Sequence, residues 1–105
     1  MGQEKDFSGS LRIEEKHEIK TQKPKMYKVI LHNDDYTTME FVVDVLIEVF
    51  DKTRQEATII MLDVHKKGKG ICGIYTYDIA VTKAEKVREL ARQRDFPLLA
   101  TVEEA

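Results

Sequence analysis

The sequence lacks several features that would place it in a specialised protein class. It contains a single cysteine, Cys72, which cannot form a disulfide within the chain. This favours a reducing compartment. No apolar run approaches the roughly 18 residues that a transmembrane helix needs, and the N-terminal stretch MGQEKDFSGS lacks the apolar core of a signal peptide. We therefore expect a soluble, cytoplasmic protein that does not bind membranes.

The charge balance and the absence of catalytic and phosphate-binding motifs exclude further classes of protein. The net charge is −2, without the basic excess that is usual for a nucleic-acid-binding domain. The sequence has neither a Gly-x-Ser-x-Gly nucleophile motif nor a glycine-rich phosphate loop. A zinc site needs three or four ligands, and Cys72 stands on a different segment from His65. We expect no nucleic-acid partner, no cofactor, no metal site and no catalytic residue.

Length and composition indicate one folded domain and a tail. A chain of 105 residues forms one domain at most, and its 42% hydrophobic and 34% charged residues are ordinary for a globular domain. Residues 1–25 are rich in Glu, Lys, Gln and Ser, so they cannot bury enough apolar surface to offset the entropy of ordering. We predict a disordered N-terminal extension over residues 1–25 and a folded domain over residues 26–105.

Three segments have the pattern of β-strands. Tyr27, Val29 and Leu31 share one face of the segment MYKVILHN, and this period of two indicates a strand. Residues 70–77 become β-branched and aromatic toward their end, which predicts a second strand. Residues 98–102 alternate again and predict a third.

Two of the intervening segments have the period of amphipathic helices. The first helix ends near Phe50, and Thr37 or Thr38 is suited to be its N-cap. Thr53 and Glu56 have the spacing of a capping box at the start of the second helix. The apolar positions recur at helical spacing; they are Met39, Val42, Val43, Leu46, Val49 and Phe50 in the first helix and Ala57, Ile60, Met61 and Val64 in the second.

A third helix completes the predicted fold. Gly68 is suited to end the second helix, because a residue in the left-handed conformation commonly follows a helix. The third helix begins at Asp78 or Thr82 and ends before Pro97. The order βααβαβ predicts an α+β fold, with a small three-stranded antiparallel sheet and three helices packed on one of its faces.

Two groups of polar residues could carry chemistry. Asn33, Asp34 and Asp35 follow the first strand directly. They could form an Asx turn that leads into the helix, or they could bind a cation, either a metal or an ammonium group. A calcium ion would need six or more oxygen ligands. His65, near the end of the second helix, suits the negative pole of that helix. The residues alone leave these alternatives open.

Three separated segments resemble the ClpS adaptor family, in the order in which that family has them. They are residues 26–50, MYKVILHNDDYTTMEFVVDVLIEVF, residues 57–65, ATIIMLDVH, and residues 70–73, GICG. The resemblance spans residues 26–105. One departure is Thr38, where the family commonly has proline. Proline in the first helical turn presets the backbone, and threonine can cap the helix instead.

The resemblance implies how a substrate would be held. In this family the Asn-Asp turn and the helix histidine bind the free α-amino group of a substrate. The matching residues are Asn33, Asp34 and His65, with Asp35 beside them. The side chain of the first residue of the substrate, which is Leu, Phe, Tyr or Trp, would enter an apolar pocket. That pocket would be lined by Thr37, Met39, Val42, Met61, Val64 and Leu98.

The resemblance also implies a partner. It predicts a monomeric adaptor, not an enzyme, that delivers N-degron peptides and proteins to the N-terminal domain of the ClpA-type AAA+ unfoldase of the ClpAP protease. The matching unfoldase-contact residues are Asp78 and Lys83. Two other functions compete with this one. The chain could be an interaction or regulatory domain without a pocket for an N-terminal residue, or a metal-dependent hydrolase that uses Asp34, Asp35 and His65.

Overall fold

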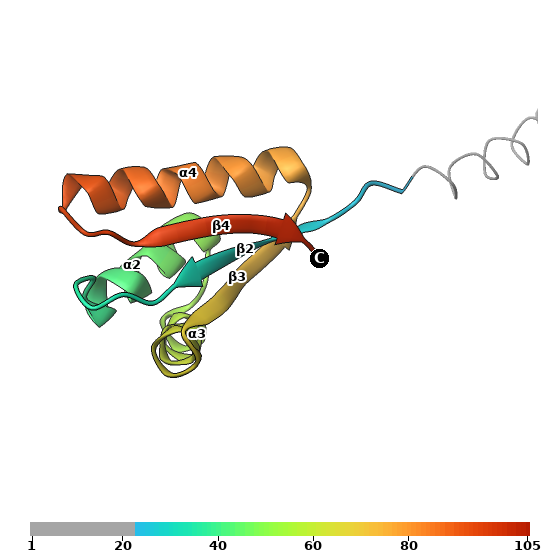
Figure 1. The fold of residues 1–105 in the computed structure, drawn as a ribbon. Helices are drawn as coiled ribbons and strands as arrows, with labels where there is room; N and C mark the ends of the chain where they lie inside the picture. The colour runs from blue at the N-terminus through green and yellow to red at the C-terminus, as the bar shows by residue number, and fades with distance from the viewer. Residues whose placement is uncertain (1–22) are drawn as a thin grey trace, which may run out of the picture.

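The computed structural model describes residues 23–105, and the order of the elements is the one predicted. Apart from its last residues, the predicted extension over residues 1–25 lies outside the described part. The elements are β2 (Tyr27–His32), α2 (Met39–Phe50), α3 (Arg54–Lys67), β3 (Lys69–Tyr75), α4 (Tyr77–Gln93) and β4 (Leu99–Glu104) (Figure 1).

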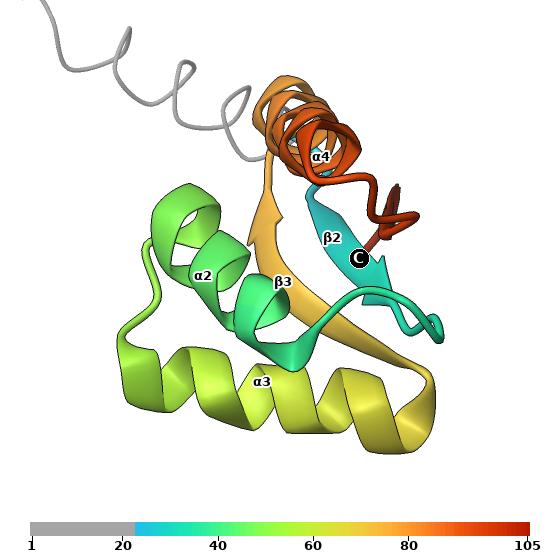
Figure 2. The same ribbon diagram turned by 90° about the vertical axis from the view of Figure 1, so that its left-hand side faces the viewer.

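The sheet has β2 at its centre, with the order β3-β2-β4 and antiparallel pairing on both sides. Tyr27 at the start of β2 lies opposite both Tyr75 and Glu104. The register with β3 shifts between Val29 and Ile30. The three helices of residues 23–105 gather around one face of the sheet, and no helix of this described part covers the opposite face (Figure 2). The predicted α+β fold is therefore confirmed.

The core lies between that sheet face and the helices. Val29 and Leu31, which alternate along β2 as predicted, are fully buried, as is Leu46 of α2. The inward positions of α4 are mostly alanine, which lets this helix pack closely on the sheet; they are Ala80, Ala84, Val87 and Ala91. Cys72 is also buried, and its burial raises the pKa of the thiol to about 12. The thiol is therefore protonated at neutral pH.

Local hydrogen bonds define the starts of α2 and α3. Thr38 is the N-cap of α2, and its hydroxyl accepts a hydrogen bond of 3.1 Å from the Phe41 amide. The predicted capping box is confirmed, with distances of 2.9 Å from the Thr53 amide to the Glu56 carboxylate and 3.1 Å from the Glu56 amide to the Thr53 hydroxyl. Of the two N-cap candidates for α2, Thr38 is thus the one used.

Three predicted boundaries were wrong. The strand predicted over residues 70–77 ends at Tyr75, and α4 begins at Tyr77 with Thr76 as its N-cap. Asp78 therefore lies in the first turn of α4, where a carboxylate still faces the positive end of the helix dipole. The extended backbone of Thr76 joins strand and helix directly and leaves no separate capping loop. The last strand occupies Leu99–Glu104 instead of residues 98–102.

None of the helices within residues 23–105 has the length and apolarity that a membrane crossing demands.

We predict that Thr38→Ala lowers the free energy of unfolding by about 1 kcal/mol, because the Phe41 amide loses its capping oxygen. Urea denaturation measures the change. Thr58→Ala is the control, since that exposed hydroxyl bonds only the Arg54 carbonyl in its own helix. Its expected effect is within about 0.5 kcal/mol. Equal losses for both variants would contradict the capping role.

Candidate functional site

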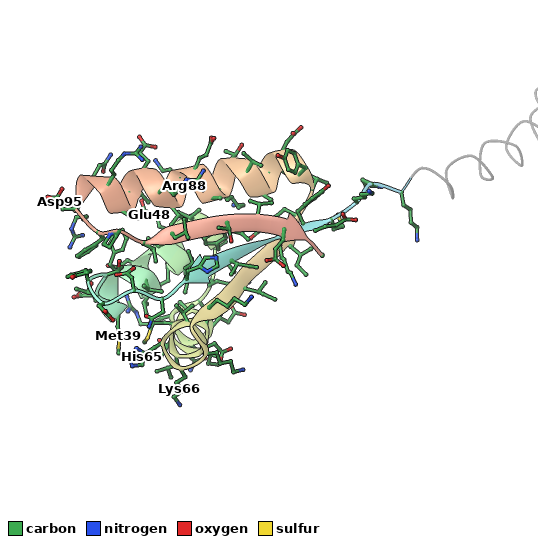
Figure 3. All side chains as sticks on the ribbon, viewed as in Figure 1. Met39, Glu48, His65, Lys66, Arg88 and Asp95 are labelled. Carbon is green, nitrogen blue, oxygen red and sulfur yellow. The ribbon has the colours of Figure 1, made fainter. Side chains whose placement is uncertain are left out.

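A cavity of about 280 Å³ lies where the turn after β2, the start of α2 and the C-terminal half of α3 meet. Met39 of α2 and His65 of α3 are seen there in Figure 3, each projecting from its own helix toward this region. The structure brings together nine of the ten residues that the sequence placed in the α-amino site and the pocket; they are Asn33, Asp34, Asp35, Thr37, Met39, Val42, Met61, Val64 and His65.

Asp34 organises the polar end of this cavity. Its Oδ1 accepts hydrogen bonds from the backbone amides of Tyr36, at 2.8 Å, and Thr37, at 2.7 Å. Its Oδ2 accepts a third bond from the Thr37 hydroxyl, also at 2.7 Å. This is an Asx turn reinforced by a side-chain contact. The carboxylate is held in one orientation, at the edge of the cavity.

These bonds also keep Asp34 charged. Partial burial raises the pKa of its carboxyl, but the hydrogen bonds from Thr37 and Tyr36 together outweigh that effect and leave the pKa below its ordinary value. The group is therefore ionised at neutral pH. An ionised carboxylate has about four acceptor sites, and the turn uses three of them. One acceptor site remains for a donor that enters the cavity.

A backbone hydrogen bond ties this turn to the end of α3. The Asn33 amide donates to the Gly68 carbonyl at 2.8 Å, and the Gly68 amide donates to the Val64 carbonyl at 3.0 Å. Gly68 has a φ of 91°, in the left-handed region that glycine adopts without strain. The sequence showed Gly68 only as a helix end, because no local pattern reveals a bond to a residue so distant along the chain. The consequence is that Asn33 and His65 are both held in the lining of one cavity.

The other end of the cavity is apolar. Val42 and Val64 are 6% and 2% exposed, and Met61 is half-buried. Met39 differs from the prediction that it belongs to the buried face of its helix, because it is 47% exposed. It is the first residue of α2 and stands next to the turn, so its side chain faces the cavity and solvent and not the sheet. The lining of the cavity thus combines the charged and polar groups of the turn with a buried aliphatic wall.

Three predicted site residues lie outside the cavity: Leu98, which was expected to line it, and Asp78 and Lys83, which were expected to contact the unfoldase. Leu98 is 5% exposed and belongs to the core just before β4, outside the lining of the cavity. Asp78 is exposed in the first turn of α4. Lys83 is half-buried, and its Nζ donates to the Val49 carbonyl at 2.8 Å near the end of α2. Its ammonium also lies 5.3 Å from the centre of the Tyr75 ring. Lys83 thereby links α4 to the end of α2.

The carboxylates and imidazoles of residues 23–105 do not form a metal site, since no three His, Cys, Asp or Glu side chains in that part of the chain gather closely enough to hold an ion. Asp34, Asp35 and His65 share the cavity, but they do not make such a group. What the arrangement offers a ligand is a fixed negative charge, an amide and an imidazole at one end and an apolar wall at the other.

Comparison with known proteins is consistent across three kinds of match. The family model described as "ATP-dependent Clp protease adaptor protein ClpS" matches residues 22–101. The ATP-dependent Clp protease adapter protein ClpS of Syntrophus aciditrophicus is 54% identical over 95% of this chain and 92% of its own length. The protein of the same name from Acetivibrio thermocellus is 58% identical over 87% of this chain and 92% of its own length.

A solved structure is similar as well. It is Agrobacterium tumefaciens ClpS2 bound to L-phenylalaninamide, with a TM-score of 0.77 and 40% sequence identity. The similarity covers 79% of this chain and all of that one.

We predict that Gly68→Ala lowers the free energy of unfolding by roughly 1–2 kcal/mol, because alanine is strained in the left-handed conformation. A methyl group there would meet nothing within 4 Å, so the cost is conformational and not steric. Gly68→Asn is the matched control and is expected to cost less, since asparagine tolerates this conformation. If urea denaturation gives the same loss for both, the left-handed backbone is not the reason for glycine.

Proposed function

Because the chain belongs to the ClpS family of ATP-dependent Clp protease adaptor proteins, we propose that its cavity binds the N-terminal residue of protein substrates. The ligand is a free α-amino group with a bulky hydrophobic first side chain, Leu, Phe, Tyr or Trp, as found in N-degrons. The protein then delivers the bound substrate to the ClpA unfoldase of the ClpAP protease, as a cytoplasmic monomer. The observation that carries this proposal is the ionised Asp34 at one end of a cavity whose other end is aliphatic.

The polar end suits an α-ammonium group. An α-amino group has a pKa near 8, so at pH 7 it is mostly charged and presents three donors. Asp34 offers the acceptor site that its turn leaves free, Asn33 offers an amide carbonyl, and the His65 imidazole offers a ring nitrogen. An internal peptide nitrogen has one donor and no charge. It would leave polar groups unpaired at a cost of about 1–3 kcal/mol each.

The apolar end suits the first side chain. Burial of a Leu or Phe side chain contributes roughly 1.5–3 kcal/mol. Val42 and Val64 form a buried wall, and the flexible thioethers of Met39 and Met61 can adjust to side chains of different shape. Agrobacterium tumefaciens ClpS2 was solved with L-phenylalaninamide, a ligand that combines a free α-amino group with a bulky aromatic side chain. The same combination of groups fits the chemistry of the cavity in this chain.

Delivery requires a surface that is separate from the cavity. We assign unfoldase docking to the start of α4, around Asp78 and Lys83. Asp78 is exposed, and its neighbours Tyr77 and Ile79 are 55% and 49% exposed, so a carboxylate and two large side chains are accessible together at the start of α4. None of these residues lines the cavity. A bound N-terminal residue would therefore leave this docking surface accessible.

We expect a peptide that begins with free Leu to bind, and the same peptide with an acetylated N-terminus to bind at least about a hundredfold more weakly, since two or more hydrogen bonds and a charge are lost. Fluorescence anisotropy with a C-terminal label measures both. Equal affinity of the two peptides, or no binding of either, would contradict the proposal that the protein binds N-terminal residues.

Two substitutions separate the charge of Asp34 from its role in the turn. Asp34→Asn keeps an oxygen for the Tyr36 and Thr37 amides, whereas Asp34→Ala removes it. Both variants should lose most of the affinity for the free-Leu peptide, by about tenfold or more. Only Asp34→Ala should also lose about 1 kcal/mol or more of stability in urea denaturation. Wild-type affinity in Asp34→Asn would show that the charge does not hold the ligand.

A further inference from the structure

We infer that Gly70, a residue outside the cavity, sets the width of the cavity and thereby the size of the first side chain that it accepts. This inference rests on the function proposed above. Gly70 pairs with Leu31 in the sheet, on the side of β3 that faces α3. An ideal Cβ at Gly70 would lie 2.8 Å from Cγ2 of Val64 and 3.4 Å from the Ile60 carbonyl oxygen. Strand and helix thus approach so closely here that a side chain does not fit.

Val64 is the link between Gly70 and the cavity, because it lines the cavity and its Cγ2 is the nearest atom that a Cβ at residue 70 would meet. A methyl group on residue 70 would force it to move. Val64 is 2% exposed and lies in the core cluster with Leu31, which is fully buried. Its branched side chain has few rotamers available within a helix. Because Val64 lines the cavity, we expect the displaced methyl group to enter it.

A narrower cavity discriminates by size. Leu occupies less of the cavity than Phe, Tyr or Trp, so the larger first residues should be affected most. A difference of one methylene in an apolar pocket changes affinity by about 10–200-fold. Contraction of the pocket by one methyl group should therefore be measurable as a change in preference, and not only as a loss of binding.

The chain offers a matched control at Gly73, in the same strand. A Cβ at Gly73 would meet the hydroxyl end of the Tyr75 side chain, and Tyr75 is only half-buried. Neither residue lines the cavity. Gly73→Ala thus introduces the same methyl group into β3 with a steric conflict of its own, but without a contact to Val64.

The test compares two peptides with free N-termini that differ only in the first residue, Leu or Trp. We expect the affinity ratio of Trp over Leu to fall by about tenfold in Gly70→Ala and to stay at the wild-type value in Gly73→Ala. An equal loss for both peptides in Gly70→Ala would overturn the inference, because it would indicate that α3 as a whole had moved.

A second comparison covers the case in which Gly70→Ala does not fold. Val64→Ala removes the group that conflicts with a Cβ at residue 70. Val64→Ala and Val64→Ala/Gly70→Ala should then have the same Trp over Leu ratio, and a further tenfold fall in the double variant would overturn the role of Val64.

A crystal structure of Gly70→Ala, or of Val64→Ala/Gly70→Ala against Val64→Ala, separates this inference from the function it rests on. If the wild-type protein binds neither peptide, the proposed function fails. The position of residue 64 then decides whether a methyl group at residue 70 displaces the Val64 side chain. A Val64 methyl group displaced into the cavity supports the inference, and an unmoved Val64 beside a shifted α3 overturns it.

Discussion

The hydrogen bond from the Asn33 amide to the Gly68 carbonyl is the contact on which the site depends. It continues the pairing of β2 with β3 by one step beyond His32 and Lys69, so the register of the sheet determines where the polar turn lies. On the other side, Gly68 is bonded to Val64 and ends α3. The turn that carries Asn33 and Asp34 and the helix that carries Val64 and His65 are therefore fixed to each other through backbone atoms. A chain with a different register would have the same residues but no shared cavity.

Asp34 has two roles that support each other. Its carboxylate builds the turn by accepting three hydrogen bonds, and the same bonds lower its pKa and keep it negative. Because the pKa is lower in the folded state, this contribution to stability is fully present above the ordinary pKa of aspartate. It is lost as the pH falls through the lower folded value. At neutral pH the turn and the charge are both present. A ligand ammonium group would therefore meet an acceptor that is already oriented, with little cost in side-chain entropy.

The sequence predicted those features that depend on neighbouring residues. The alternation of Tyr27, Val29 and Leu31, the Thr53–Glu56 capping box and the left-handed Gly68 are local patterns, and the structure has all of them. The predictions failed where packing between distant segments determines the start of a helix or the environment of a side chain. Thr76 caps α4 without a side-chain hydrogen bond, so the local sequence indicates the more typical capping residues Asp78 and Thr82 instead. Met39 and Leu98 have similar apolar character in sequence, yet one opens to the cavity and the other is buried in the core. Likewise, the close contact between Gly70 and Val64 follows from the packing of β3 on α3 and leaves no mark in the local sequence.

The central claim is that Asp34 directly receives the α-ammonium group of a ligand. It is tested most directly by the pKa of the Asp34 side chain, followed by carboxyl-carbon NMR with and without a saturating free-Leu peptide. A positive charge next to a carboxylate lowers its pKa. The account predicts that the pKa of Asp34 falls further when the peptide is present, while the carboxyl-carbon signal of Asp78, which lies outside the cavity, does not respond to the peptide. An unchanged pKa of Asp34 in the presence of a bound peptide would contradict the account.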